Sequence, residues 1–250
     1  MDAGEGFAPP MFLAYETGML ASLPAVLFII NNYMKIIVLG AARTGSTKLC
    51  SVLAKVCSLT NLGELIQYRN LSDYIGNLQR VNYLPSQDNV VAKFAFVNFQ
   101  RIGLFNPINL NSVDWNSPDI VISAHRDNLV DRFVSHMVAL ERNVYHGKTS
   151  EPITPITINH RVVDEWVSYH APEVTNQLLT TIQSMRKKPI HRITYDEICD
   201  DTQLLTRVRS LGITTTCDIS IPLSATGIDY RLIVNNYAEI EQEFAVRGLL

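Results

Sequence analysis

A short apolar run, a glycine-containing turn and a helical pattern follow one another directly in residues 35–56, and this order constrains the fold most. Residues 35–39 read KIIVL, a run typical of a strand that is buried on both faces of a parallel sheet. The turn 40–45 (GAARTG) follows. From Ser46 onward, apolar residues recur at the spacing of one helix face, at Leu49, Val52, Leu53 and Val56. A strand that passes straight into a helix predicts an α/β protein.

Later segments repeat this alternation of strand and helix. Strands are predicted at residues 90–97, 119–124 and 190–194. Helices are predicted over residues 129–144, over residues 160–187 with a break or kink at Pro172, and over residues 202–211. The alternation predicts a parallel sheet flanked by helices, and the lack of Pro/Gly-rich linkers predicts one domain over residues 34–250.

Residues 1–33 precede the first predicted strand and are expected to be an N-terminal extension, either poorly ordered or not native, with Met34 as the natural start. Its apolar run contains Pro24 and is shorter than the roughly 20 residues that a spanning helix needs, so stable membrane insertion is not expected. A net charge of −3 gives no reason to expect nucleic-acid binding. Four cysteines without metal-binding spacing, in a chain long enough to fold without disulfides, predict a reducing, cytoplasmic location.

The turn after the first strand has the residues of an anion-binding site. Backbone N–H groups of a glycine turn that opens a helix converge on one point, and the helix dipole favours negative charge there. Gly45 allows the backbone to approach a ligand closely, and Ser46 and Thr47 add hydroxyl donors. Arg43 supplies a planar, permanently charged guanidinium that suits phosphate or sulfate. The turn therefore predicts a phosphate or sulfate site.

The same turn departs from the loop of nucleoside triphosphatases. That loop reads GxxxxGK[ST], and its lysine reaches the β- and γ-phosphates. Here Ser46 stands at the lysine position, Arg43 comes three residues earlier, and Lys48 follows two residues too late. Hydrolysis of ATP or GTP is therefore disfavoured. A P-loop nucleotide kinase or NTPase stays open as an alternative, as does a non-catalytic nucleotide-binding protein.

The run Arg43-Thr44-Gly45-Ser46-Thr47 after an apolar strand resembles the 5′-phosphosulfate loop of the sulfotransferase family, most closely in its carbohydrate and bacterial-type members. The resemblance implies a P-loop-like α/β architecture for one sulfotransferase-like domain. It also implies transfer of a sulfuryl group from 3′-phosphoadenosine 5′-phosphosulfate (PAPS) to a hydroxyl or amine of a carbohydrate or other small molecule. The expected product is adenosine 3′,5′-bisphosphate (PAP), and the scheme requires no metal.

Two further segments resemble the family in the same order along the chain. Arg126 follows the strand at residues 119–124, and Ser135 lies in the next helix; the family uses such an arginine and serine to bind the 3′-phosphate. The spacing is one residue longer than the family's usual one, so either the extra residue lies in the loop or Ser135 is not a ligand. The run 193–198 (ITYDEI) resembles a structural strand–helix element of many members.

Transfer to a hydroxyl needs a general base, for which the chain offers three candidates. Glu64 comes shortly after the first helix, where the bacterial sugar sulfotransferases that the chain resembles place a glutamate base, although a solvated loop residue is an equal alternative. His125 is the second candidate because histidine titrates near neutrality. Lys93 could reach the ligand or extend to the surface. Acceptor specificity is expected in loops such as 68–87 and 142–159.

Overall fold

The computed structural model describes residues 33–65, 87–95, 110–142, 154–218 and 229–250. Residues Tyr33–Leu250 form one compact unit. The expected N-terminal extension lies almost entirely outside the described residues, as does most of the two loops that we expect to set acceptor specificity. The described residues comprise a sheet, the helices that cover it and some of the connections between them.

The described residues form a five-stranded, all-parallel sheet with the strand order β2-β3-β1-β4-β5. The prediction of a parallel sheet flanked by helices is thereby confirmed. The strands are β1 (Lys35–Gly40), β2 (Thr60–Glu64), β3 (Val90–Ala95), β4 (Ile120–His125) and β5 (Ile190–Thr194). β2 was not predicted, because its sequence TNLGE lacks an apolar run and it forms an exposed edge of the sheet.

The strand order determines where this sheet can bind a ligand. From β1 the chain passes to the edge of the sheet at β2, whereas from β4 it passes to the opposite edge at β5. Adjacent strands whose connections leave in opposite directions open a crevice at their carboxyl ends, and ligands of open α/β sheets bind there. β1 and β4 end within one residue of each other, since Gly40, the last residue of β1, pairs with Ala124 and β4 ends at His125. The turn after β1 and the turn after β4 therefore border the expected ligand position.

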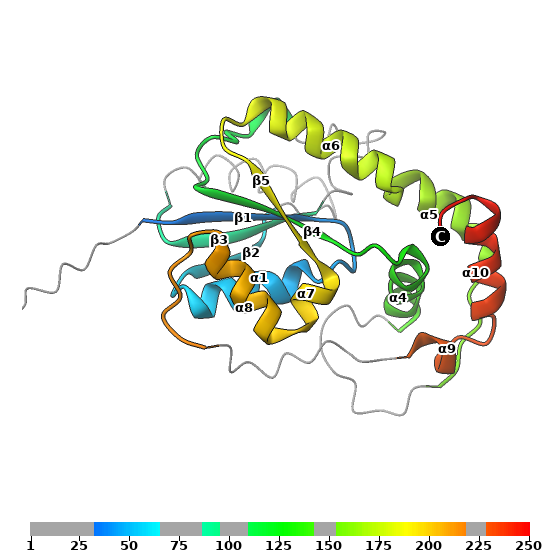
Figure 1. Ribbon diagram of the computed structural model, residues 1–250. Helices are drawn as coiled ribbons and strands as arrows, with labels where there is room; N and C mark the ends of the chain where they lie inside the picture. Colours follow the sequence, from blue (N-terminus) through cyan, green and yellow to red (C-terminus); the bar gives the residue numbers. More distant parts are fainter. Residues whose placement is uncertain (1–32, 66–86, 96–109, 143–153, 219–228) are drawn as a thin grey trace, which may run out of the picture. The chain divides into compact units, whose positions relative to one another are not determined.

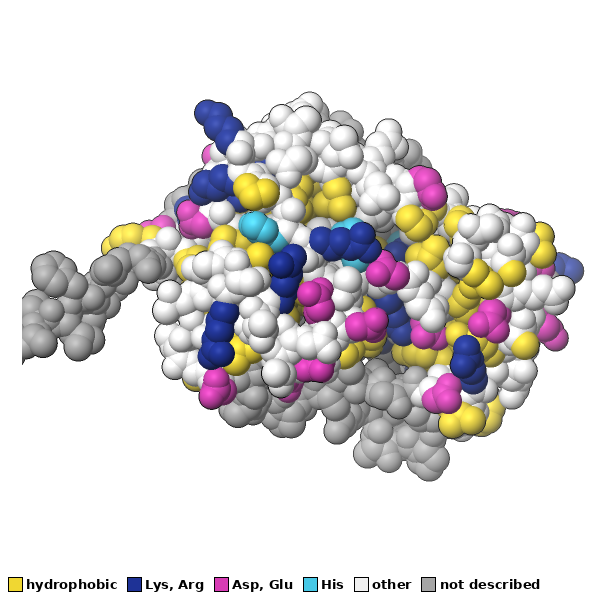
Figure 2. Space-filling model, viewed as in Figure 1, with side chains coloured by type: hydrophobic (Ala, Val, Ile, Leu, Met, Phe, Trp, Pro, Cys, Tyr) yellow, Lys and Arg dark blue, Asp and Glu magenta, His cyan; other side chains and the backbone are white. Residues whose placement is uncertain are grey.

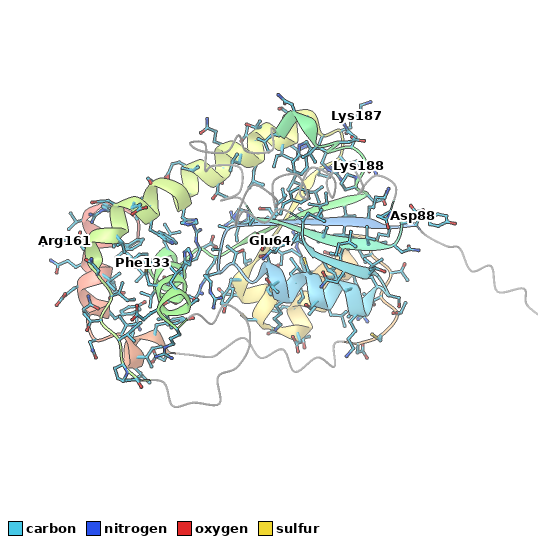
Figure 3. All side chains as sticks on the ribbon, turned by 180° about the vertical axis from the view of Figure 1, so that it is seen from behind. Glu64, Asp88, Phe133, Arg161, Lys187 and Lys188 are labelled. Atoms are coloured by element: carbon cyan, nitrogen blue, oxygen red, sulfur yellow. The ribbon has the colours of Figure 1, made fainter. Side chains whose placement is uncertain are left out.

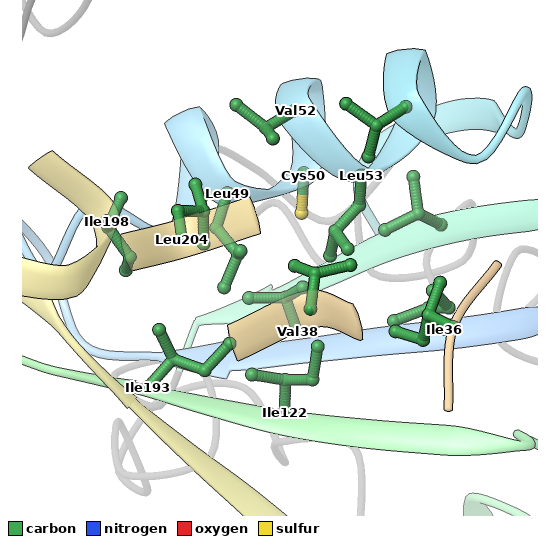
Figure 4. Close-up of a cluster of buried hydrophobic side chains, with 14 of the residues drawn as sticks. Ile36, Val38, Leu49, Cys50, Val52, Leu53, Ile122, Ile193, Ile198 and Leu204 are labelled. Carbon is green, nitrogen blue, oxygen red and sulfur yellow. The ribbon is translucent and has the colours of Figure 1, made fainter. Parts of the chain in front are cut away.

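Helices cover both faces of the sheet. Successive side chains of β1 point to opposite faces, and both sets are apolar, so each face needs a covering layer. Ile36 and Val38 pack against α1 (Ser46–Val56) and against two further helices on the same face, as Figure 4 shows. Ile37 and Leu39 belong to the core on the other face, which α6 (Pro172–Met185) covers (Figure 1). The two further helices are α7 (Tyr195–Cys199) and α8 (Asp201–Ser210).

A third hydrophobic core lies beyond the carboxyl end of the sheet and fixes α4 (Leu129–Glu141) (Figure 1). The Phe133 ring on α4 meets the Trp166 ring edge to face at 5.4 Å and lies 5.6 Å from the Phe244 ring. This core brings the C-terminal residues against α4, although they are far away in the sequence. The other helices of the core are α5 (Val163–His170), α9 (Tyr230–Ile233) and α10 (Tyr237–Val246).

The predicted break at Pro172 is confirmed. α5 ends at His170, and Pro172 is the first residue of α6. Proline fits the first turn of a helix because its missing N–H would have no intrahelical partner there, but it interrupts a helix that precedes it. Two short 3₁₀ helices complete the described elements, at Leu110–Ser112 and His160–Val162.

The surface of the described part carries both signs of charge close together. Figure 2 shows Lys and Arg side chains interspersed with Asp and Glu over one face of the molecule. Two of the ion pairs at the surface join Lys188 to Asp119 and Arg192 to Asp127, at 3.5 and 2.5 Å. Within the described residues, no helix has both the length and the apolar character needed to cross a membrane.

Candidate functional site

The turn after β1 folds back over the end of its own strand. Arg43 and Gly45 both have a left-handed backbone, with φ of 65° and 79°. A Cβ on Gly40 would lie 2.8 Å from Thr44 Oγ1, so only glycine fits this close approach. The buried Thr44 hydroxyl donates to the Ala41 carbonyl at 2.9 Å. Thr44 therefore holds the turn together with its side chain, and an anion could take a donor from this residue only at the backbone N–H.

The start of α1 is open to an anion. Gly45 occupies the N-cap position, and the first intrahelical bond runs from Leu49 N–H to the Gly45 carbonyl at 3.0 Å. The N–H groups of residues 46–48 therefore have no acceptor within the helix. Gly45 has no side chain that could cap them, and the first turn contains no acidic residue. The helix dipole favours a negative group at this position.

Replacing Gly45 with alanine should destabilise the fold by about 1–3 kcal/mol, because it strains the backbone and crowds α7. The new Cβ would lie 3.2 Å from Tyr195 Cδ2 and 3.2 Å from Ile198 Cγ2, at φ +79°. Gly212→Ala is the matched control, since φ is +77° and no atom lies within 4 Å of the added Cβ. It should cost only about 1 kcal/mol. Urea unfolding measures both losses, and equal losses would show that the contacts with α7 cost nothing.

Arg43 reaches from this turn to α4. Its Nε donates to Ser135 Oγ at 2.8 Å, and the Tyr230 hydroxyl of α9 donates to the same oxygen at 2.8 Å. Ser135 is only 2% exposed. The resemblance groups Ser135 with Arg126, but this hydrogen bond joins Ser135 to Arg43. The sequence contained no signal for the contact of Tyr230.

Arg126 follows β4 and also contacts α4. Its guanidinium lies 3.5 Å from Asp131 Oδ2 and stacks on the Tyr195 ring, with its carbon 4.2 Å from the ring centroid. Asp131 and Ser135 are four positions apart on one helix, so their side chains are neighbours on the same face. The structure therefore brings Arg43 and Arg126 to one face of α4.

Tyr195 places Arg126 near the turn after β1 as well. The Arg126 guanidinium stacks on the Tyr195 ring. The same ring lies 3.2 Å from the position that a Cβ added to Gly45 would take. The family resemblance implied a structural role for the segment 193–198. Its first turn is indeed fixed by a capping box between Thr194 and Glu197, but Tyr195 in addition forms one wall beside Arg126.

A third arginine of this region was not predicted from the sequence. Arg132 of α4 is 4% exposed, stacks over the Trp166 ring at 4.8 Å and donates to the His170 carbonyl at 2.5 Å. Since His170 is the last residue of α5, this bond caps a helix C-terminus. Burial, followed by the charge of Arg126, lowers the pKa of Arg132 to about 10, so it remains charged at neutral pH. An arginine in an amphipathic helix gives no sequence signal of such burial.

Glu64 ends β2 rather than following α1 in a loop, and it is tied to the start of α1 through Lys93. Its Oε2 lies 2.9 Å from Lys93 Nζ, which also donates to Thr47 Oγ1 at 3.3 Å. Lys93 therefore lies between two candidate site residues, Glu64 and Thr47, at the carboxyl end of the sheet. Figure 3 shows Glu64 at the carboxyl end of the sheet, at the opposite end from Asp88.

His125 and Lys48 have partners of their own. His125 Nε2 lies 2.7 Å from Ser123 Oγ on the same strand. Burial, followed by the charge of Arg192, lowers the pKa of His125 to about 4, so the imidazole is neutral at pH 7 and a weak base. Lys48 Nζ lies 3.1 Å from Asp201 Oδ1 of α8. This ion pair ties Lys48 to α8 rather than to the turn.

Neither a comparison with protein-family models nor one with curated proteins finds a match for this chain. The fold and the site define a parallel α/β protein in which two arginines meet one helix at the carboxyl ends of β1 and β4.

Proposed function

We propose that this protein is a sulfotransferase, which moves a sulfuryl group from PAPS to a hydroxyl or amine of a small-molecule or carbohydrate acceptor. One observation carries the proposal. Arg43 and Arg126 leave the two strands that flank the switch in strand order, and they contact α4 one helical turn apart. A nucleotide with phosphate at both its 5′ and 3′ positions needs two such cations.

The residues present fit the two phosphate groups of this donor. The 5′ end would lie at the start of α1, where the backbone N–H groups of residues 46–48 and the Arg43 guanidinium supply donors. Ser46 and Thr47 would add hydroxyl groups there. The 3′-phosphate would meet Arg126, whose stacking on Tyr195 holds the guanidinium plane in place.

The chemistry demands stabilisation of charge more than covalent help. The acceptor oxygen forms a bond to sulfur as the bond between sulfur and the 5′-phosphate oxygen breaks, and the electron pair of that bond leaves with the phosphate. Arg43 would stabilise the charge that grows on the phosphate, since a donor fixed in advance at such a position is a large catalytic term. Glu64, oriented by Lys93, would receive the proton of the acceptor.

Calorimetric titration with PAP tests the proposal against the alternative of a nucleotide kinase or NTPase. PAP should bind, and ATP with Mg²⁺ should bind more weakly, because Ser46 replaces the lysine of the triphosphatase loop. Lys48 cannot substitute for that lysine while it pairs with Asp201. Tighter binding of ATP than of PAP would contradict the proposal. Binding of PAP without sulfate transfer to any acceptor of a broad panel would favour a non-catalytic protein.

Arg126→Ala should weaken the binding of PAP by about 10- to 100-fold, the usual range for loss of a charged hydrogen-bonded partner. Binding of adenosine 5′-phosphate, which has no 3′-phosphate, should change little. Arg209→Ala is a matched control, because Arg209 lies on α8 and pairs with the exposed Asp218. Titration of both variants with both nucleotides measures the effect. Equal loss for the two nucleotides would mean that Arg126 does not bind the 3′-phosphate.

A further inference from the structure

Arg43 and Arg126 each contact one side chain of α4, and that side chain accepts a hydrogen bond from a tyrosine of the C-terminal helices. The first set is Tyr237–Asp131–Arg126, and the second is Tyr230–Ser135–Arg43. The two α4 residues lie one helical turn apart, so the two sets run side by side. Neither tyrosine was a candidate from the sequence.

In the first set, Asp131 uses one carboxylate oxygen for each partner. The Tyr237 hydroxyl of α10 donates to Oδ1 at 2.7 Å, and Oδ2 lies 3.5 Å from the Arg126 guanidinium. The tyrosine therefore fixes the rotation of the carboxylate. A fixed carboxylate in turn limits the positions that the guanidinium can take beside Tyr195.

In the second set, the buried Ser135 hydroxyl accepts two hydrogen bonds and can still donate one. A serine hydroxyl has two lone pairs and one hydrogen. Ser135 Oγ accepts from Arg43 Nε and from the Tyr230 hydroxyl, both at 2.8 Å, so both lone pairs are used. Its own hydrogen is therefore left for donation to a third group. Without Tyr230, one lone pair would be released and the hydroxyl could rotate.

We propose that Tyr230 and Tyr237 are positioning residues of the anion site, which orient Ser135 with Arg43 and Asp131 with Arg126 toward the two phosphate groups of the nucleotide. This inference rests on the proposed function, because it takes PAP as the ligand. It makes the C-terminal helices part of the site. The alternative is that the tyrosines only pack, since both rings belong to the core around α4.

Tyrosine-to-phenylalanine variants of the full chain separate orientation from packing, because the ring stays and only the hydroxyl is lost. Tyr237→Phe should weaken the binding of PAP by about 3- to 10-fold, the factor expected for one hydrogen bond, with adenosine 5′-phosphate almost unaffected. Tyr230→Phe should weaken both nucleotides by a similar factor, since Arg43 serves the 5′ end. Tyr33→Phe is the control at a ring that is 63% exposed, and should change neither.

A double variant gives a readout that a purely structural role would not produce. In an Arg126→Ala background, Tyr237→Phe should cause no further loss of PAP binding, because the group that it orients is gone. The same loss in both backgrounds would overturn the inference, as would an equal loss for PAP and adenosine 5′-phosphate in Tyr237→Phe. So would unchanged binding by both tyrosine variants while the wild-type protein binds PAP. Failure of the wild-type protein to bind PAP would overturn the proposed function as well.

Discussion

Arg43→Ala should lower the rate of sulfuryl transfer by about 10³-fold, the lower range for an arginine that stabilises a transferred group in the related phosphoryl chemistry. The variant loses the guanidinium of the turn after β1 and the hydrogen bond from Nε to Ser135. The backbone N–H groups at the start of α1 would remain, so binding of the nucleotide should suffer less than turnover. Release of PAP from PAPS, followed over a panel of sugars and small alcohols, measures the rate.

Two further variants test whether the loss of rate comes specifically from the Arg43 guanidinium. Arg43→Lys keeps the charge but cannot present a planar fork to both Ser135 and a phosphate, so its rate should fall between those of the wild-type protein and of Arg43→Ala. Arg209→Ala removes an exposed arginine of α8 and should leave the rate unchanged. Near-normal turnover by Arg43→Ala would remove this residue from the mechanism.

Glu64→Gln should lower turnover by about 10²- to 10³-fold while PAP binds as before, because the amide keeps the shape of the side chain but cannot accept a proton. The amide also loses the ion pair with Lys93, which bridges this residue to Thr47. A PAP titration of the same variant shows whether the cofactor end is disturbed. The turnover and the affinity together separate a base from a residue that only supports the turn.

Asp88→Asn is the matched carboxylate control. Asp88 pairs with Lys35 at 4.0 Å and lies at the amino end of the sheet, away from Glu64 (Figure 3). This variant should turn over normally. If Glu64→Gln does so too, the proton acceptor lies elsewhere. His125 would then be tested next, although its lowered pKa makes it a weak base.

Local patterns predicted the parts of the fold that depend on neighbouring residues. The apolar run of β1, the glycine turn and α1 follow directly from the sequence, and Pro172 separates α5 from α6 as expected. Strand β2 was not predicted, because an edge strand needs no apolar run. The helices α9 and α10 were not predicted, because their packing in the core around α4 stabilises them.

Individual residues of the candidate site were predicted from the sequence, but the hydrogen bonds that connect them were not. Arg43 and Arg126 were singled out as candidates because each follows a predicted strand. The hydrogen bonds around them were not predicted, because Arg43 and Ser135, Ser135 and Tyr230, and Asp131 and Tyr237 are 92, 95 and 106 positions apart. The resemblance grouped Ser135 with Arg126, whereas the packing of α4 places it against Arg43. Tyr195 shows the same limit, since the segment that contains it resembled a purely structural element.

The position of β1 in the middle of the sheet affects how the chain can fold during its synthesis. β1 is the first described strand to leave the ribosome, yet its two neighbours begin only at Val90 and Ile120. Neither of these two strands can form a hairpin with it, since both are parallel to β1 and parallel strands require long crossovers. A nascent chain that ends before residue 90 therefore contains the apolar residues Ile36–Leu39 without either of these strand partners. Such intermediates attract chaperones, and folding should be slow compared with that of a helical bundle of equal length.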